Sequence, residues 1–471
     1  MTMHSVHRLA GDPELRAPST FEPPASLYAR ALSPGADLAH ARRIARLAFG
    51  PAADRDFTVR YWDAATEPAG HTPARFTIHL RHPSALRAMF WPPAELRVAE
   101  AFVSGAYDVD GDLEAATALA STLRDRLCRP RTLVRLLYHV LALPAPSTAR
   151  VGPRLERHAH HAHQHSLTRD GAAVRSHYDV GNDFYTLWLD RGLVYSCAYF
   201  TSDDATLDDA QRAKLDHLCR KLRLQPGERL LDVGCGWGAL VRHAAEHYGV
   251  RATGVTLSPA QAELATARVR EAGLSDRVDI QVRDYRTLAP DEPFDKIVSV
   301  GMFEHVGRQQ MPVYFAAMHR LLRPGGLFMN HGIIEAPTRR PHGWRASLRG
   351  YVWRQGSFID RDVFPDGDLV QLATEVGIAE QAGFEVRDVE SLRPHYARTL
   401  RAWVQRLESH WDEAVGITSD ATARTWRLYM AASAHAFASG QIGLAQVLFG
   451  KPDLTGHVGL PPTRRDLYVD P

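Results

Sequence analysis

The feature that most constrains this chain is a glycine-rich turn directly after a short apolar segment. Arg229-Leu-Leu-Asp-Val233 has the residue types of a buried strand, and Gly234, Gly236 and Gly238 follow at alternate positions. A helix is expected to begin near Ala239. Because glycine lacks a Cβ atom, such a turn can be tight and its backbone can approach a ligand closely. The pattern predicts a strand–turn–helix unit with a ligand beyond the carboxyl end of the strand.

Strands and helices alternate after this turn. Strands separated by helices of this length indicate a parallel, doubly wound sheet. Two helical stretches, near 183–188 and 208–222, precede the turn. The pattern predicts further strands at 252–256, 278–282, 294–300 and 326–330, with helices at 259–272 and 311–322.

The part of the chain before the glycine-rich turn divides into segments by composition and by its prolines and glycines. One segment predicts a small domain, in which Phe57, Val59 and Tyr61 alternate as on a strand with one buried face. The fold class is therefore α/β, a doubly wound sheet with a helical lid and a small N-terminal α+β domain. The expected segments are a tail and helix over 1–50, the small α+β domain over 51–128, a linker over 129–170 and the sheet domain over 171–471.

The linker contains two features of its own. Leu133 to Leu143 is an apolar run bounded by prolines, typical of a short helix that packs on a neighbouring domain or, given its flanking basic residues, contacts a membrane. His158 to His165 holds five histidines. This tract lacks the carboxylate or thiol partners that fix metal geometry, so it indicates a solvated linker and no metal site is predicted.

Charge and cysteine content narrow the function classes. The net charge is +2, from 56 basic and 54 acidic residues, which gives no reason to expect nucleic acid as a partner. Four cysteines form no CxxC pair, which favours reduced thiols in the cytoplasm. No run of 18 uncharged apolar residues is present, so a lipid substrate would have to be approached from outside the membrane.

The glycine-rich turn has a specific form. Asp232 stands two residues before Gly234, and this arrangement resembles the cofactor loop of class I methyltransferases, which implies S-adenosylmethionine. Asp232 can then bind the ammonium group of the methionine moiety. Where an acid usually holds the ribose, the chain has the neutral Thr256 and Gln261, which could equally be a strand end and part of a helix start capped by Ser258.

After the third strand, Asp284 and Tyr285 stand where adenine usually lies in such folds. Further segments resemble the cyclopropane-fatty-acyl-phospholipid synthases and the related mycolic acid cyclopropane synthases. The matching segments are His177–Tyr185, Tyr195-Ser-Cys-Ala-Tyr-Phe200, Leu231–Gly238, Gly254–Ser258, Phe303-Glu-His-Val306, Asn330-His-Gly-Ile-Ile334 and Phe364–Gly367, with a weaker match over Glu100–Leu113.

This resemblance implies roles for individual residues. Tyr195 and Ser196 would bind the cofactor. A bicarbonate ion would be bound by the side chains of Cys197, Glu304, His331 and Tyr396 and by the backbone of Ile333. Each has a structural alternative: a buried thiol for Cys197, a helix cap for Glu304, a core histidine for His331 and packing for Tyr396.

The resemblance implies transfer of a methylene unit from S-adenosylmethionine to a cis double bond of an unsaturated phospholipid acyl chain. The protein would contact the inner face of the membrane transiently. Whether it forms a homodimer is left open by the resemblance. The first alternative is a fatty-acyl C-methyltransferase that yields a methyl-branched or methylene product. A catalytically silent cofactor- or lipid-binding protein is the second, and a small-molecule or RNA methyltransferase is disfavoured.

The segment 336–370 interleaves aromatic and basic residues, as in Arg339–Arg345 and Tyr351–Ile359. Stacking on nucleic acid would use similar side chains. Under the resemblance, the segment forms an acyl-chain tunnel with arginines facing the phosphate, and its alternative is a packed lid without a ligand.

Overall fold

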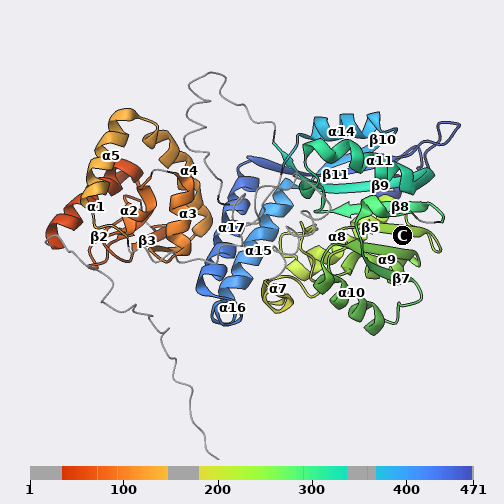
Figure 1. Ribbon diagram of the computed structural model, residues 1–471, viewed down its shortest axis with the longest axis horizontal. Helices are drawn as coiled ribbons and strands as arrows, with labels where there is room; N and C mark the ends of the chain where they lie inside the picture. Colours follow the sequence, from red (N-terminus) through yellow and green to blue (C-terminus); the bar gives the residue numbers. More distant parts are fainter. Residues whose placement is uncertain are drawn as a thin grey trace, which may run out of the picture.

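The computed structural model describes residues 34–71, 73–92, 94–146, 180–289, 291–336, 358 and 368–468. The histidine-rich tract, most of the aromatic and basic segment 336–370, and the ends His177 and Phe364–Gly367 of the matching segments lie outside these residues. Within them the chain forms a small N-terminal domain and a larger sheet domain (Figure 1).

The small domain packs helices on a four-stranded sheet of order β2-β1-β3-β4. Phe57, Val59 and Tyr61 are all buried in its core, as their alternation predicted. Its elements are α1 (Pro34–Phe49), η2 (Ala52–Asp54), β1 (Thr58–Arg60), β2 (Thr66–Glu67), β3 (Phe76–Leu80), α2 (Ala85–Phe90), α3 (Glu95–Val103), β4 (Tyr107–Gly111), α4 (Leu113–Leu127) and α5 (Pro130–Ala142).

The helix predicted within the linker, α5, belongs to this small domain. Leu136 and Val140 are fully buried in the same apolar core as α1. Helices α1 and α5 therefore both pack with the small domain, each across a boundary that the sequence predicted at residue 50 or 128. The physical reason is spacing: Leu136, Val140 and Leu143 recur every three to four residues and form one buried stripe. The packing alternative for this helix is therefore confirmed.

The large domain is built on a seven-stranded sheet of order β10-β11-β9-β8-β5-β6-β7. Strands β9, β8, β5, β6 and β7 run parallel. β11 pairs antiparallel with β9, and β10 pairs antiparallel with β11, so β11 alone runs opposite to the other strands of this sheet. The strands are β5 (Arg229–Val233), β6 (Arg251–Thr256), β7 (Val278–Val282), β8 (Phe294–Val300), β9 (Leu322–Glu335), β10 (Glu385–Ser391) and β11 (Ile442–Gly450).

Helices cover both faces of this sheet. One apolar cluster joins the strands to α8 (Leu207–Leu222) and α9 (Ala239–Tyr248). The opposite cluster joins them to α11 (Met311–Leu321) and α14 (Leu372–Gln381). Together with α10 (Pro259–Glu271), this arrangement confirms the predicted doubly wound α/β class.

A helical layer lies beyond the edge of the sheet. It consists of α7 (Asn182–Trp188), α15 (Arg393–Ser409), α16 (Trp411–Ile417) and α17 (Asp420–Ala438). The pair α15 and α17 lies between the small domain and the sheet (Figure 1). The chain ends in a short helix, α18 (Arg465–Tyr468). None of the described helices is long and apolar enough to cross a membrane.

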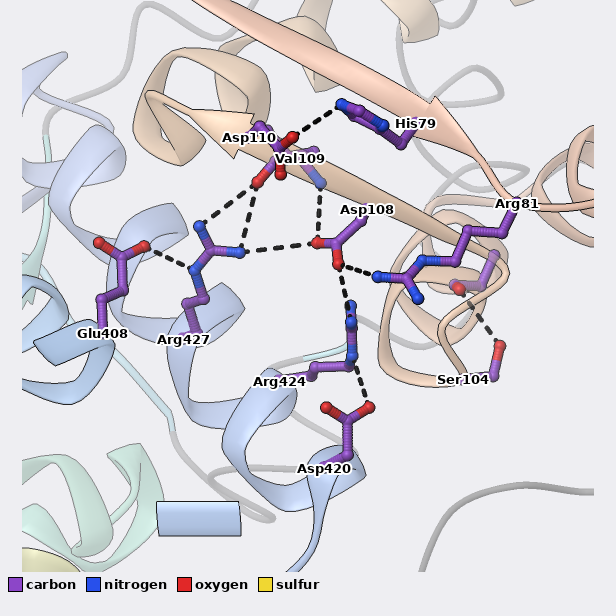
Figure 2. A network of polar contacts seen from close by, with 11 residues as sticks. His79, Arg81, Ser104, Asp108, Val109, Asp110, Glu408, Asp420, Arg424 and Arg427 are labelled. Carbon is purple, nitrogen blue, oxygen red and sulfur yellow. Dashed lines mark hydrogen bonds and ion pairs between the residues drawn. The ribbon is translucent and has the colours of Figure 1, made fainter. Parts of the chain in front are cut away.

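A cluster of ion pairs joins the two domains at α17 (Figure 2). Asp108 of β4 accepts from Arg81 at 2.7 Å within its own domain and from Arg424 of α17 at 2.8 Å. Arg427 of α17 also lies 3.7 Å from the Asp108 carboxylate. Arg424 is only 7% exposed in its side chain, so the contact between the domains contains a nearly buried charge that Asp108 neutralises.

Candidate active site

The main pocket lies where the carboxyl ends of β5 and β6 meet the glycine-rich turn. This is the position at which open parallel sheets bind ligands. Tyr195 and Ser196, which precede α8, form part of its wall. The predicted cofactor residues that line it are Tyr195, Ser196, Asp232, Gly234, Gly236, Thr256, Gln261, Asp284 and Tyr285.

The turn needs glycine for two different reasons. Gly234, Gly236 and Gly238 all have positive φ angles, which side chains other than glycine rarely adopt. Gly238 does not line the pocket; a Cβ atom there would lie 3.1 Å from Ala265 of α10, so it permits helix packing rather than ligand approach. Gly254 of β6 is similar, because a Cβ atom would lie 2.9 Å from Cys235.

Asp232 is a buried carboxylate in the pocket wall. Its side chain is only 2% exposed, and burial raises its pKa to about 7. Among the described residues it accepts no hydrogen bond and forms no ion pair, and the only charge that shifts its pKa belongs to Lys214. A buried carboxylate without a partner is costly and suits a cationic ligand group.

Thr256 and Gln261 meet each other beside the pocket. The Thr256 hydroxyl donates to Gln261 Oε1 at 2.8 Å. Ser258 caps α10 by accepting from the Gln261 amide at 3.3 Å, with Pro259 in the first turn, so the helix-start reading is confirmed for Ser258. The side-chain amide nitrogen of Gln261, Nε2, stays available to donate to a ribose hydroxyl. The Thr256–Gln261 pair therefore keeps a donor group toward the pocket.

Asp284, which was predicted to stand where adenine usually lies, lines the pocket and is held by its neighbour Arg286. Its carboxylate accepts two hydrogen bonds from the Arg286 guanidinium, at 2.9 and 2.7 Å, and one from the Arg286 amide. Tyr285 packs edge-on against Tyr314 at 5.5 Å between ring centroids. The side of the pocket after β7 is therefore a fixed polar and aromatic wall.

Several pocket residues were not found from the sequence. Trp237 lies inside the glycine-rich turn and donates from its indole to Asn182 of α7 at 2.9 Å. Lys214 of α8 also lines the pocket and belongs to none of the predicted motifs. The available signal was a lysine among the apolar positions of a helix, which alone does not indicate a ligand.

The second predicted group lies next to this pocket. Glu304 follows β8 in the short helix η4 (Phe303–His305), and its Oε1 accepts from the Ile333 amide of β9 at 2.7 Å. Burial raises the Glu304 pKa to about 7. Its second oxygen, Oε2, is buried without a hydrogen-bond partner in the described part of the chain.

His331 lies two residues before Ile333 on β9, so both side chains point to the same face of the strand. Its Nδ1 lies 3.1 Å from the Gln446 amide nitrogen of β11. Because that amide is a donor, the ring proton is assigned to Nε2. Burial lowers the His331 pKa well below its ordinary value, and Nε2 has no partner among the described residues.

Cys197 and Tyr396 approach the same region from the helical layer. The Cys197 thiol is fully buried, lies 3.8 Å from the Leu392 carbonyl at the start of α15, and has a pKa raised by burial. Tyr396 of α15 packs on Phe437 at 4.6 Å between centroids. Cys197 and Tyr396 belong to one apolar cluster, against which Ile333 also packs.

The five predicted catalytic residues are thus brought to one region at the end of β9, although none of them lines the cofactor pocket. The two sites are adjacent along the chain at two points. Ser196 of the pocket precedes Cys197, and Met302 and His305 of the pocket flank Glu304. The raised pKa of Cys197 keeps the thiol neutral and argues against a nucleophilic role.

The sheet order, the glycine-rich turn and the pocket at the carboxyl ends of the strands define a class I S-adenosylmethionine-dependent methyltransferase. A family model described as mycolic acid cyclopropane synthetase matches residues 165–447. A domain of unknown function matches residues 46–130. The chain belongs to the mycolic acid cyclopropane synthetase family, and the resemblance drawn from its motifs is confirmed.

Individual relatives agree with this assignment. A probable fatty acid methyltransferase of Pseudomonas putida is 42% identical over 411 residues, covering 87% of this chain and 95% of the relative. Cyclopropane mycolic acid synthase 3 of Mycobacterium tuberculosis is 39% identical over 290 residues, covering 60% and 99%. The crystal structure of mycolic acid cyclopropane synthase CmaA1 complexed with SAH and CTAB has a TM-score of 0.55 at 36% identity, covering 59% and 97%.

Proposed function

We propose that this methyltransferase transfers a methylene unit to a cis double bond of an unsaturated phospholipid acyl chain and closes a cyclopropane ring. The observation that carries the proposal is that Glu304 Oε2 and His331 Nε2 are both buried without a hydrogen-bond partner among the described residues. Unsatisfied buried polar atoms are costly, and each of these two atoms suits a small polar ligand group. The names of the relatives support an acyl substrate.

The reaction needs an attack, a proton loss and a ring closure. When bound, S-adenosylmethionine supplies a methyl group on a sulfonium sulfur. The alkene electron pair forms a bond to that methyl carbon as the carbon–sulfur bond breaks, which leaves a carbocation on the acyl chain. Loss of one proton from the added methyl group then provides the electrons that close the ring, so the product gains one CH2.

The proton must leave through groups near Glu304 and His331. Bicarbonate, when bound, would supply the base. Neutral His331 would donate to it from Nε2, and Glu304 Oε2 would accept its proton, since a carboxyl group with a pKa of about 7 can exchange protons near neutral pH. His331 and the Oε2 atom of Glu304 are buried, which excludes water that would otherwise trap the cation.

Product analysis tests this proposal. Purified protein is incubated with S-adenosylmethionine and vesicles of unsaturated phospholipid, and the lipids are analysed by mass spectrometry and proton NMR. The expected product has gained one CH2 without losing an unsaturation equivalent, with cyclopropane protons at high field. Absence of any lipid product with phospholipid, free fatty acid or acyl carrier substrates would contradict it.

The alternative is a fatty-acyl C-methyltransferase, favoured by the name of the relative from Pseudomonas putida. It forms the same carbocation but resolves it by a hydride shift and loss of a proton, which leaves a methyl branch beside a double bond or an exocyclic methylene group. Mass alone does not separate a methylene branch from a ring. NMR does, because a branched product shows methyl or exocyclic methylene signals and lacks cyclopropane protons.

We further propose that the protein reaches its substrate by contacting the cytoplasmic, anionic surface of a membrane through α5. Val134, Tyr138 and Leu141 are exposed, by 68%, 69% and 46%, on the face opposite the buried stripe. Arg131 and Arg135 are exposed on the same face. Apolar side chains flanked by arginines fit the interface of an anionic bilayer.

Vesicle flotation tests this contact. Leu141→Glu together with Tyr138→Ser should reduce binding to anionic phosphatidylglycerol vesicles, because both changes remove apolar area from the proposed face. Leu454→Glu, on a fully exposed loop of the large domain, is the matched control and should bind like wild type. Equal binding by all three proteins would contradict a role for α5, and sedimentation of the same samples without lipid would show whether the protein is a homodimer.

A further inference from the structure

Lys214 is a buried lysine in the wall of the cofactor pocket that no step above uses. It lies on α8, on the face that packs against the sheet, and its exposed fraction is 1%. Its ammonium group donates to Ser196 Oγ at 2.9 Å. Burying an ammonium group costs several kcal/mol unless a partner compensates it, so this position calls for an explanation.

The residues around Lys214 do not supply that partner. Within the described residues no carboxylate forms an ion pair with its ammonium, although Asp190 and Asp232 are near enough to influence its pKa. Asp190 is already used, because its two oxygens accept from the amides of Gly192 at 2.7 Å and Val194 at 2.8 Å. An ammonium group has three donors, and Ser196 takes one of them.

Lys221, two turns further along the same helix, shows the contrast. It is also buried, at 2% exposure, but it lies 3.1 Å from Asp388 and 2.5 Å from Glu390. The chain thus neutralises one buried lysine of α8 with two carboxylates of β10. It leaves the other facing the pocket with a single neutral partner.

The pocket therefore contains two groups of opposite charge, and neither forms an ion pair with a described residue. Asp232 presents a carboxylate without a partner, and Lys214 presents an ammonium without a counter-ion. Both line the same pocket as Ser196. The methionine end of the cofactor carries one ammonium and one carboxylate, which is the complementary set.

We propose that Lys214, together with the Ser196 hydroxyl, binds the α-carboxylate of the cofactor while Asp232 binds its α-ammonium. Lys214 fixes the orientation of the methionine tail by this contact. Because the Ser196 oxygen accepts from Lys214, its own proton is free to donate to the same carboxylate. At neutral pH Lys214 stays largely protonated, since burial lowers its pKa only to about 8.

Binding measurements with altered ligands test this assignment without using turnover. Calorimetry compares S-adenosylhomocysteine with two analogues, one without the α-carboxylate and one without the α-amino group. Wild type should bind the analogue without the carboxylate about 10- to 100-fold more weakly, as expected for one charge-assisted hydrogen bond. In Lys214→Met this preference should disappear, while the preference for ligands that carry the amino group should remain.

Asp232→Asn provides the crossed control. It should lose the preference for the amino group and keep the preference for the carboxylate. Lys221→Met removes a lysine from the same helix face outside the pocket and should leave both preferences intact even if it lowers stability.

The outcomes separate ligand binding from a structural role. If Lys214 only supports the wall of the pocket, Lys214→Met will weaken all three ligands by the same factor, and the proposal is overturned. Equal affinity of wild type for the ligands with and without the carboxylate would also overturn it. Should Lys214→Met fail to fold, the wild-type comparison still decides the question. The variant Ser196→Ala gives a second test, because it should reduce the logarithm of the affinity ratio between the ligands with and without the α-carboxylate by half or more.

Discussion

At the scale of a single residue, burial raises the pKa of the Glu304 carboxyl group to about 7, which suits the proton transfer that we propose for it. Replacing Glu304 with glutamine keeps the volume and the acceptor for the Ile333 amide but removes the ionisable group. Turnover of unsaturated lipid should fall by at least about 100-fold, the usual contribution of a positioned acid–base group. Affinity for S-adenosylhomocysteine, measured by calorimetry, should change less than about threefold.

Glu375 offers a matched control for that substitution. It is buried, its pKa is also raised to about 7, mainly by burial and further by the nearby Glu304 carboxylate, and it accepts from Asn330 at 2.8 Å. It is not part of the pocket lining. Glu375→Gln should retain most of the turnover. If both variants lose activity to the same extent, the effect of Glu304 is one of buried charge in general rather than of its position next to the cofactor pocket.

Asp232 predicts a pH dependence of cofactor binding. Burial raises its pKa to about 7 in the empty pocket, so below that pH a bound ammonium must displace a proton. Affinity for S-adenosylhomocysteine should therefore fall as pH decreases from 7 to 5, by up to about tenfold per unit. The other charged or titratable groups that line the pocket are Tyr195, Lys214, Cys235, Arg283, Asp284, Tyr285, Arg286 and His305.

The variant Asp232→Asn distinguishes the titration of Asp232 from that of these neighbouring groups. This variant should bind more weakly at pH 7 and show a flat profile between pH 7 and 5. A wild-type profile that is retained in the variant would assign the titration to His305 instead. The measurement is calorimetry in buffers of equal ionic strength.

At the scale of an element, the cofactor loop depends on close packing against β6. In Gly254→Val, the new Cβ would lie 2.9 Å from Cys235 and 3.1 Å from Ile280, so the loop must move. Overpacking of this kind costs about 1–3 kcal/mol of stability. The displaced loop should also weaken S-adenosylhomocysteine binding at least tenfold, measured by calorimetry.

The control is a glycine in a helix with open space around it. Gly377 of α14 has no atom within 4 Å of its Cβ position. Gly377→Ala should raise stability by about 0.5–1 kcal/mol through helix propensity and leave binding unchanged. Unchanged binding in Gly254→Val as well would show that the loop tolerates a shift.

At the scale of the whole molecule, Asp108 joins the small domain to α17. Asp108→Asn removes the charge that neutralises the nearly buried Arg424 (Figure 2). Stability should fall by about 1.5–3 kcal/mol, the range for a hydrogen bond to a charged group. Thermal unfolding together with limited proteolysis of the small domain measures this loss.

Asp110, two residues further along β4, is 70% exposed and pairs only with His79 among the described residues. Asp110→Asn should change stability by less than about 0.5 kcal/mol, as is usual for exposed ion pairs. An equally small effect of Asp108→Asn would mean that Asp420, which also pairs with Arg424, suffices to hold it.

Local patterns predicted the central strands well. The bounds of β5, β7 and β8 agree with the prediction. β5 and β8 are largely buried apolar segments, whereas β7, at the edge of the sheet, is identified by the alternation of Val278, Ile280 and Val282. Strands β10 and β11 and the helices α15 and α17 were not located. β11 pairs with β9 across more than 100 residues of sequence, and a pairing over that distance leaves no local signal.

The candidate site divides in the same way. The glycine-rich turn and Asp232 could be identified from the chain, because they form a short pattern with its own chemistry. Cys197, Glu304 and His331 were assigned only through the resemblance of their segments to the family. Their partners could not be identified from the chain. Gln446, which orients His331, comes from β11, and its role follows only from the strand pairing that places it beside the ring.

The sequence by itself determined the α/β class, the cofactor and the family, because these depend on residues that are neighbours along the chain. Only the tertiary structure decided that α5 belongs to the small domain and that Asp284 is held by Arg286. It also decided that Lys214 faces the pocket without a counter-ion. Those facts depend on burial and on which charges meet, and both arise only when distant segments pack together.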